Sequence, residues 1–266
     1  MPDLVWFEAH TPEVYEPAED TFLLLDVIHS QTAALVSMEP RLVVEVGPGA
    51  GAVSAFLAAS LGESTAVLAI DINPDAVRAT LATARDNGVE GRVAAVEGNL
   101  LSSLPTLSAT TLKGEPAAAS AVASALDATG HKADVIVFNP PYVPTPDEEV
   151  DASLIARAWA GGLRGRRVID RFLPELAGSL SKPGGVAFMI VVRENLPRDI
   201  AAAAAGLGLV TVGVASSRAH NERLSVIKFR WPGDAGRAGE DDGMPLLGEP
   251  GAVFADEAAA VPESCA

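Results

Sequence analysis

The stretch that decides the fold reads Leu42-Val43-Val44-Glu45-Val46-Gly47-Pro48-Gly49-Ala50-Gly51. It opens with a short, mostly apolar run that stops at a glycine turn, which is typical of a strand buried in a parallel sheet. Residues 52–61 follow without glycine or proline and are predicted to form a helix. A strand, a tight glycine turn and a helix in this order predict an α/β fold with a ligand site at the carboxyl end of the strand.

The same alternation continues along the chain. We expect further strands at residues 66–70, 92–97, 134–138 and 185–192, and further helices at residues 16–28, 74–87 and 168–180. Segments 209–214 and 224–229 have no helix between them, so we expect them to pair as a hairpin with the last strand inserted antiparallel. The prediction is a Rossmann-like α/β domain, with a seven-stranded, largely parallel sheet and helices on both faces.

Composition limits the classes of function. The 266 residues carry 19 Lys and Arg against 35 Asp and Glu, and this net charge of −16 argues against a surface built to neutralise nucleic-acid phosphates. The single cysteine, Cys265, provides neither a disulfide framework nor a cysteine-based zinc site, and the histidines lack metal-ligand spacing, so we expect no bound metal. Glycines interrupt the one long uncharged stretch, residues 200–217, and no secretory signal is visible. We therefore expect no membrane span and a cytoplasmic location, with the nucleus as a second one.

Two segments look like additions to a domain that we place at residues 1–231. Residues 107–132 are rich in Ala, Ser and Thr and poor in large apolar side chains, so we expect a flexible or weakly helical surface insertion. Residues 232–266 hold many more acidic than basic side chains, with Arg237 as the one basic residue. We expect this acidic tail to be disordered.

The glycine turn is the first candidate binding site. Gly47, Gly49 and Gly51 allow a sharp turn and let a ligand approach the backbone closely. The spacing departs from that of dinucleotide-binding loops, and a carboxylate at Glu45 would repel a pyrophosphate. The same carboxylate could accept hydrogen bonds from a cationic amino-acid group, which favours S-adenosylmethionine over NAD as the ligand.

The ends of two neighbouring strands supply further candidate contacts. Asp71 could accept hydrogen bonds from both hydroxyls of a ribose, because Asn73 is available to cap the helix that follows. Asn99 could hydrogen-bond an adenine, with Leu100 packed on the ring. A simple turn-forming role for Asn99 fits the sequence equally well.

The most specific signal is Asn139-Pro140-Pro141-Tyr142, which directly follows the strand at residues 134–138. Two prolines stiffen the turn and leave backbone carbonyls without competing local N–H donors. The side-chain carbonyl of Asn139 and the backbone carbonyl of Pro140 could each accept one hydrogen of a planar NH2 group. Tyr142 would then form one wall of the slot that holds this planar group. Binding both hydrogens would turn the delocalised nitrogen lone pair toward a methyl donor and stabilise the transition state.

These residues resemble the class I methyltransferases of the HemK type, which methylate the glutamine of the Gly-Gly-Gln motif in translation release factors. Residues 14–26, Val-Tyr-Glu-Pro-Ala-Glu-Asp-Thr-Phe-Leu-Leu-Leu-Asp, are similar to the N-terminal signature of the eukaryotic and archaeal branch, the catalytic subunits of release-factor glutamine N5-methyltransferases. The resemblance implies S-adenosylmethionine as donor and S-adenosylhomocysteine as product. It implies that the donor's amino-acid part contacts Thr21, Glu45 and Gly47, its ribose Asp71 and its adenine Asn99 and Leu100, with Asn139 between donor and substrate. The family usually has Asp where this chain has Asn99.

The resemblance also implies two partners: a small zinc-binding activating subunit that forms a heterodimer with the catalytic chain, and a class I release factor as substrate. Residues 92–97 are expected at the edge of the sheet, where Val93 and Val96 would be a liability if exposed, so we expect a partner to cover that edge. Two other substrates suit the slot. The adenine amino group of nucleic acid is disfavoured by the acidic charge, and a protein lysine, as in a histone, would need a deprotonation route.

Overall fold

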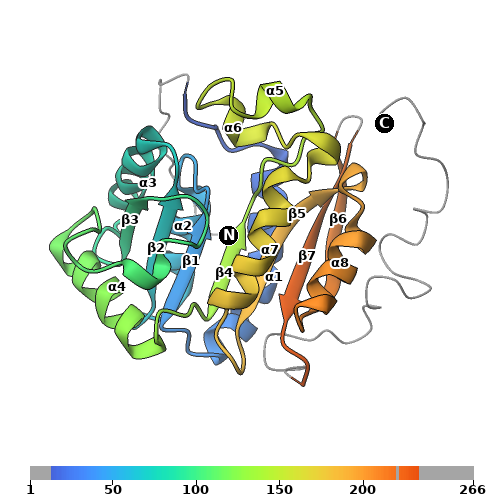
Figure 1. The fold of residues 1–266 in the computed structure, drawn as a ribbon. Helices are drawn as coiled ribbons and strands as arrows, with labels where there is room; N and C mark the ends of the chain where they lie inside the picture. Colours follow the sequence, from blue (N-terminus) through green and yellow to red (C-terminus); the bar gives the residue numbers. More distant parts are fainter. Residues whose placement is uncertain (1–12, 220–221, 234–266) are drawn as a thin grey trace.

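Seven strands form one sheet in the order β3-β2-β1-β4-β5-β7-β6 (Figure 1). The structure is a computed structural model that describes residues 13–219 and 222–233. The strands are β1 (Leu42–Val46), β2 (Ala66–Asp71), β3 (Val93–Glu97), β4 (Val135–Phe138), β5 (Val186–Val192), β6 (Val210–Ala219) and β7 (Glu222–Arg230). Strands β1 to β5 are parallel, whereas β7 lies antiparallel between β5 and β6. The predicted seven-stranded α/β sheet with an antiparallel last strand is confirmed.

Helices cover both faces of this sheet (Figure 1). One face packs against α1 (Glu19–Ser37), α2 (Ala52–Ser60) and α3 (Pro74–Asp86), and the other against α4 (Pro116–Thr129), α7 (Arg167–Ser179) and α8 (Pro197–Gly206). The short helices α5 (Asp147–Val150) and α6 (Ala156–Trp159) lie beyond the carboxyl ends of the parallel strands, at the top of Figure 1. Three 3-10 turns complete the described structure: η1 (Leu104–Thr106), η2 (Leu163–Gly165) and η3 (Arg193–Asn195).

Strand β1 shows why the sequence folds as a central strand. Successive side chains of a strand point to opposite faces, so Val44 packs in the cluster under α4 and α7 while Val43 packs in the cluster under α1 and α2. Glu45 is the one polar residue in β1, and it is buried on the α2 side. A charged side chain at the carboxyl end of an otherwise apolar central strand marks the place where a ligand is needed to complete the site.

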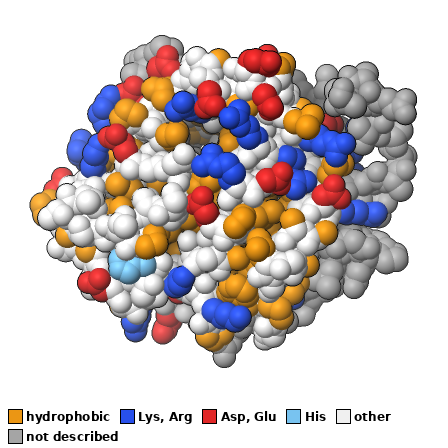
Figure 2. Space-filling model, viewed as in Figure 1, with side chains coloured by type: hydrophobic (Ala, Val, Ile, Leu, Met, Phe, Trp, Pro, Cys, Tyr) orange, Lys and Arg blue, Asp and Glu red, His pale blue; other side chains and the backbone are white. Residues whose placement is uncertain are grey.

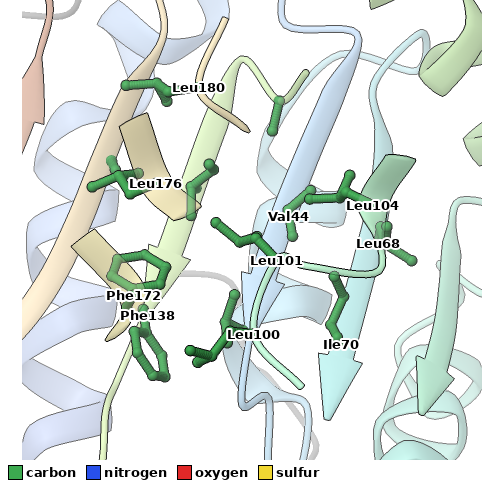
Figure 3. Close-up of a cluster of buried hydrophobic side chains, with 14 of the residues drawn as sticks. Val44, Leu68, Ile70, Leu100, Leu101, Leu104, Phe138, Phe172, Leu176 and Leu180 are labelled. Atoms are coloured by element: carbon green, nitrogen blue, oxygen red, sulfur yellow. The ribbon is translucent and has the colours of Figure 1, made fainter. Parts of the chain in front are cut away.

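The cluster between the sheet and α7 fixes the strand that carries the Asn-Pro-Pro-Tyr turn (Figure 3). The rings of Phe138 at the end of β4 and Phe172 in α7 lie 4.7 Å apart between centroids, tilted by 52°. Leu100 packs in the same cluster, so the ends of β3 and β4 are joined by one apolar contact surface. This packing holds two of the predicted ligand-binding segments in fixed relative positions.

The first helix differs from its prediction at both ends. It begins at Glu19, because Ala18 is extended with φ −128° and ψ −168°, so that Pro17 precedes the helix. It continues to Ser37 because no glycine or proline interrupts residues 29–37, and Leu35 is fully buried against the core.

Residues 107–132 were expected to be a flexible or weakly helical surface insertion; the segment is mainly helical, and it is packed on the sheet instead of lying free on the surface. Residues 116–129 form α4, which carries five buried side chains: Ala118, Ala119, Val122, Ala125 and Leu126. Small alanines let the helix approach the sheet closely, so a segment that looked too poor in large apolar side chains still covers β2 and β3. Gly130, at φ +62°, ends the helix as a left-handed C-cap.

Strand β3 is at the edge of the sheet, as predicted, but the chain itself covers part of that edge. The N–H of Ala95 donates to the carbonyl of Lys113 at 2.8 Å, and the N–H of Lys113 donates to the carbonyl of Ala95 at 2.7 Å. The side chains of Lys113 and Glu97 also form an ion pair. Val93 and Val96 are both buried within the chain, so neither valine needs a partner to cover it, and the partner at this edge stays a prediction.

The predictions for the acidic tail fall mostly on residues 234–266, which lie outside the described residues. Residues 200–217 form the end of α8, a glycine turn and part of β6, as the glycines predicted. Within the described ranges, no helix is long and apolar enough to cross a membrane.

Candidate active site

A cavity of about 290 Å³ opens at the carboxyl ends of β1, β2 and β4, where the strand order reverses direction. Nine of the predicted site residues line it, seven of them from the N-terminal signature and the ends of β1, β2 and β3: Thr21, Glu45, Gly47, Gly49, Asp71, Asn99 and Leu100. Asn139 and Pro141 line it from the β4 side. The fold therefore brings together segments that are far apart in the sequence, and the volume suits a small-molecule ligand.

Glu45 forms the deepest polar group of the cavity. Its carboxylate is 4 % exposed and accepts a short hydrogen bond from the hydroxyl of Ser54 in α2. Burial raises the pKa of Glu45 to about 7, partly opposed by the hydrogen bonds from Ser54, while the charge of Asp71 adds to the increase. A cationic group bound here would restore the ionised form, because opposite charge favours the carboxylate.

The three glycines of the turn have different roles. Gly47 and Gly49 line the cavity, as predicted for residues that a ligand approaches. Gly51 is not among the lining residues; it has φ +84°, and a Cβ atom there would lie 2.6 Å from the Cα of Thr80 in α3. The predicted ligand contact of Gly51 is therefore replaced by a packing role, in which the missing side chain lets α2 and α3 approach closely.

Asp71 ends β2 and faces the cavity. Its Oδ1 accepts from the N–H of Asn73 at 2.8 Å, and its Oδ2 accepts from the N–H of Gly49 at 3.4 Å. Burial raises the pKa of Asp71 to about 6, although these N–H groups lower it. Asn73 accepts from the N–H of Asp75 at 2.9 Å and so caps α3, as the sequence predicted. The carboxylate of Asp71 is thus held at the cavity wall without serving as the helix cap.

Asn99 and Leu100 form the wall that follows β3. Leu100 has φ +57°, a left-handed conformation that is uncommon for a leucine and that turns its side chain into the cluster with Phe138. The side-chain carbonyl of Asn99 accepts from Arg171 Nη2 at 3.3 Å. This oxygen keeps a second lone pair, so Asn99 can offer a ligand an acceptor as well as the donors of its NH2 group.

The Asn-Pro-Pro-Tyr turn divides into two parts. Asn139 and Pro141 line the cavity, whereas Pro140 and Tyr142 are not among its lining residues. The ring of Tyr142 packs against both core clusters, and its hydroxyl donates to Asp20 at 3.2 Å. In the described structure Tyr142 supports the turn from behind, which differs from the predicted wall of the slot.

Asp20 is the residue that sequence reasoning missed. Acidic residues are common in the first turn of a helix, so an Asp at the start of α1 does not by itself indicate a functional residue. Its Oδ2 accepts from Tyr15 at 3.1 Å, from Asn139 Nδ2 at 2.9 Å and from Tyr142 at 3.2 Å. Its Oδ1 accepts from the N–H and the hydroxyl of Thr21, at 2.6 and 3.2 Å. The N-terminal signature therefore contacts the Asn-Pro-Pro-Tyr turn directly.

A second layer holds the turn from the side of η2 and η3. Asn195 is fully buried and donates to the carbonyls of Tyr142 and Arg164, both at 2.8 Å. Gly165 packs directly against the carbonyl of Tyr142, and Gly161 against that of Pro141, so closely that no Cβ atom would fit at either position. These contacts explain the local need for glycine beside Trp159.

Arginines surround the mouth of the cavity, and Figure 2 shows basic side chains grouped over α6 and the start of α7. Arg157 and Arg167 both pair with Asp151, at 3.4 and 3.2 Å. These two arginines share one carboxylate, and Arg171 donates to Asn99, so the positive charge of the rim is neutralised in part. Among the described side chains, no group of three or more His, Cys, Asp or Glu could hold a metal ion.

Several known proteins are similar to this chain in sequence or in fold. The chain is 40 % identical over 217 residues to methyltransferase HEMK2 of Homo sapiens, a match that covers 82 % of this chain and 89 % of that protein. It is 33 % identical over 226 residues to the eRF1 methyltransferase catalytic subunit mtq2 of Schizosaccharomyces pombe, with the same coverage. The fold matches the solved E. cuniculi Mtq2–Trm112 complex with a TM-score of 0.55 and 24 % identity, over 82 % of this chain and 99 % of that one. No protein-family model matches the chain.

Proposed function

The chain belongs to the HemK-type class I methyltransferases, the family of HEMK2 and mtq2, and we propose that it methylates the side-chain amide of the glutamine in the Gly-Gly-Gln motif of a translation release factor. The relatives at 33 and 40 % identity are named as methyltransferases, and one of them as acting on eRF1. More distant relatives are named as release factor glutamine methyltransferases, for example that of Moorella thermoacetica at 30 % identity over 180 residues.

The cavity fits S-adenosylmethionine as the methyl donor. The buried carboxylate of Glu45 offers a partner for the donor's ammonium group, and Asp71 offers a partner for its ribose hydroxyls. Asn99 and Leu100 lie on the side expected for the adenine. Bound S-adenosylmethionine would supply an electrophilic methyl group for transfer to the substrate nitrogen, with Glu45 and Asp71 holding the donor and Asn139 orienting the substrate amide.

One observation carries the choice of an NH2 substrate. The side-chain oxygen of Asn139 is buried at the cavity and has no hydrogen-bond partner among the described residues. A buried carbonyl without a partner is costly, so a bound substrate hydrogen is the partner we propose for it, and a local movement of the turn must first expose this oxygen, which water does not reach in this structure. Pro140 does not line the cavity in this structure, so its backbone carbonyl stays a predicted second acceptor, which would leave both N–H groups of the amide engaged and its nitrogen facing the donor.

The rim of the cavity supports a protein substrate over nucleic acid. Arg157 and Arg167, which could contact phosphates, are both paired with Asp151. Affinity for a nucleic-acid backbone comes from cations that are free to replace counterions, and paired arginines contribute less to it. The amide of a protein loop is therefore preferred over the adenine amino group.

A competition experiment tests the proposed function. Donor labelled in its methyl group is supplied to the chain with release factor, histone and duplex DNA, each in separate reactions and then together. We expect label in the release factor, at the glutamine of its Gly-Gly-Gln motif, and no label when that glutamine is replaced by alanine. Label that enters DNA or histone at a higher rate would contradict the proposal.

We further propose that a small zinc-binding activating subunit forms a heterodimer with this chain. Support comes from the solved relative, which is a complex of Mtq2 with Trm112. The edge of β3 is the position at which a partner strand was expected, but Lys113 already pairs with Ala95 there. A partner that adds a strand to β3 must therefore displace residues 112–114, whereas a partner that binds elsewhere leaves this pairing intact.

Hydrogen exchange separates these two binding modes. The amides of Ala95 and Lys113 should be protected in the free chain, since each donates to the other residue's carbonyl. If the partner displaces the segment, the Lys113 amide loses protection on complex formation while that of Ala95 keeps it. Absence of any complex by gel filtration, in a chain that is fully active alone, would contradict the proposed heterodimer.

A further inference from the structure

Asp20 lies directly behind the reactive turn. Its side chain is 3 % exposed and does not line the cavity, yet its Oδ2 lies 2.9 Å from the side-chain nitrogen of Asn139. Tyr15 and Tyr142 donate to the same oxygen, and Thr21 donates twice to the other. The carboxylate is therefore fixed in position by α1 and by the N-terminal signature.

This contact determines which way the amide of Asn139 faces. The two ends of an amide are similar in shape, but one end is a donor and the other an acceptor. An ionised carboxylate can only accept hydrogen bonds, so the end of Asn139 that faces Asp20 must be its NH2. The carbonyl oxygen then points away from Asp20, and this is the buried oxygen that has no partner among the described residues.

We propose that Asp20 is a positioning residue for methyl transfer: it holds the amide of Asn139 in the one orientation that presents a carbonyl, and not an NH2, to the substrate. The inference rests on the proposed function, in which the substrate is itself an NH2 group. If Asn139 were turned over, its NH2 would face the substrate NH2 and the two donors would repel each other. The orientation therefore decides whether the substrate can be bound for reaction.

The exchange Asp20→Asn tests this most sharply. The amide that it introduces can keep its carbonyl toward the N–H of Thr21, which leaves its NH2 facing Asn139. Asn139 must then turn over to accept from that NH2, so kcat should fall by about 100-fold, as for the loss of one transition-state hydrogen bond. The Kd for the donor, measured by calorimetry without substrate, should change by less than about threefold, because Asp20 does not line the cavity.

Glu19→Gln is the matched control. Glu19 is also acidic and lies in the first turn of α1, so this exchange removes the same charge from the helix N-terminus. Glu19 is exposed. If the acidic residue at position 20 acted only through the helix dipole, both exchanges would have the same small effect. We expect only Asp20→Asn to lower kcat.

The double exchange Asp20→Asn with Asn139→Asp restores the pair with its members reversed. The new amide in α1 donates to the new carboxylate after β4, and the second oxygen of that carboxylate is again an acceptor for the substrate. Turnover should recover by at least about tenfold over Asp20→Asn alone. A double variant as slow as the single one, with intact folding by circular dichroism, would overturn the proposed role.

A spectroscopic measurement reads the orientation without any substrate. The side-chain NH2 signal of Asn139, assigned by its loss in Asn139→Ala, should show one proton shifted downfield by its bond to the carboxylate. Asp20→Asn should remove that shift, and an unchanged signal would overturn the inference. Wild-type protein that fails to methylate any release factor would contradict the proposed function instead, and this measurement would still decide how Asn139 is oriented.

Discussion

Asp20 and Asn139 are 119 residues apart in the sequence, and a 2.9 Å hydrogen bond joins their side chains. It links the start of α1 to the end of β4, the two segments that carry the most specific sequence patterns of the chain. The N-terminal pattern supplies the carboxylate of Asp20, which can only accept hydrogen bonds, and the Asn-Pro-Pro-Tyr pattern supplies the amide of Asn139. The bond between them uses the NH2 of Asn139 and leaves its carbonyl for the proposed substrate. The two patterns thus form one functional unit.

The raised pKa of Glu45 predicts that donor affinity depends on pH. In the free protein this carboxyl titrates near pH 7, so at about pH 6 most molecules hold it protonated. A bound ammonium group favours the carboxylate, so binding should release a proton, and affinity should increase toward pH 7 and fall again above about pH 8, where the donor's own α-amino group loses its proton. Calorimetry in buffers of different ionisation enthalpy measures this proton directly. Glu45→Gln should bind more weakly and lose most of the pH dependence, and proton uptake on binding would contradict the account.

The raised pKa of Glu45 also determines how the stability of the folded protein changes with pH. The folded-state pKa lies above the unfolded value of 4.5, so the folded protein holds a proton that the unfolded chain releases. The contribution of Glu45 to stability is therefore fully present below about pH 4.5 and is lost as the pH rises through 7. The increase in melting temperature caused by saturating donor should accordingly be larger at about pH 8 than at about pH 6.

The packing role of Gly51, the third glycine of the turn after β1, can be tested by comparing it with Gly88. Both have positive φ, +84° and +67°, so alanine strains the backbone at each by about 1 kcal/mol. A Cβ at Gly51 would also meet Thr80 at 2.6 Å, whereas one at Gly88 would meet nothing within 4 Å. Gly51→Ala should therefore lower the free energy of unfolding by about 1–3 kcal/mol more than Gly88→Ala. Equal losses in urea titrations would show that close packing is not what Gly51 provides.

Leu126 tests whether α4 is part of the core. Its side chain is fully buried between α4 and the sheet, so Leu126→Ala should cost about 2–5 kcal/mol of unfolding free energy. Ser124 lies in the same helix but is exposed, so Ser124→Ala should change the unfolding free energy by less than about 0.5 kcal/mol. A loss at Leu126 as small as that at Ser124 would mean that residues 116–129 are the loose insertion that their composition suggested.

Periodicity predicted most of the fold because the relevant signals are local. The strand at 42–46 is confirmed residue for residue, and the glycine turn after it marks the carboxyl edge of the sheet. The antiparallel last strand was also predictable, since no helix separates β6 from β7. The burial of α4 was not predicted because alanine carries little hydrophobic signal, although its small size is what allows close packing against β2 and β3.

The candidate site was predictable where residue type alone indicates the chemistry. Glu45, Asp71 and Asn139 follow strands, and parallel strands bring their carboxyl ends together. The contact between Asp20 and Tyr142 could not be predicted, because it joins two segments across the fold and no local pattern encodes it. Gly51 and Gly165 are needed because a Cβ atom at either position would collide with the backbone of a neighbouring segment, and that contact is visible only in the folded structure.

The central claim is that the carbonyl of Asn139 accepts a hydrogen from the substrate amide. The most direct measurement is kcat for methylation of a release factor by Asn139→Ala, together with the Kd for S-adenosylmethionine. Asn99→Ala is the matched control on the opposite wall of the cavity, where we expect weaker donor binding with turnover kept at saturating donor. We predict that Asn139→Ala lowers kcat by about 100-fold or more and changes the donor Kd by less than about threefold. A variant that keeps more than about a tenth of wild-type turnover would contradict the account.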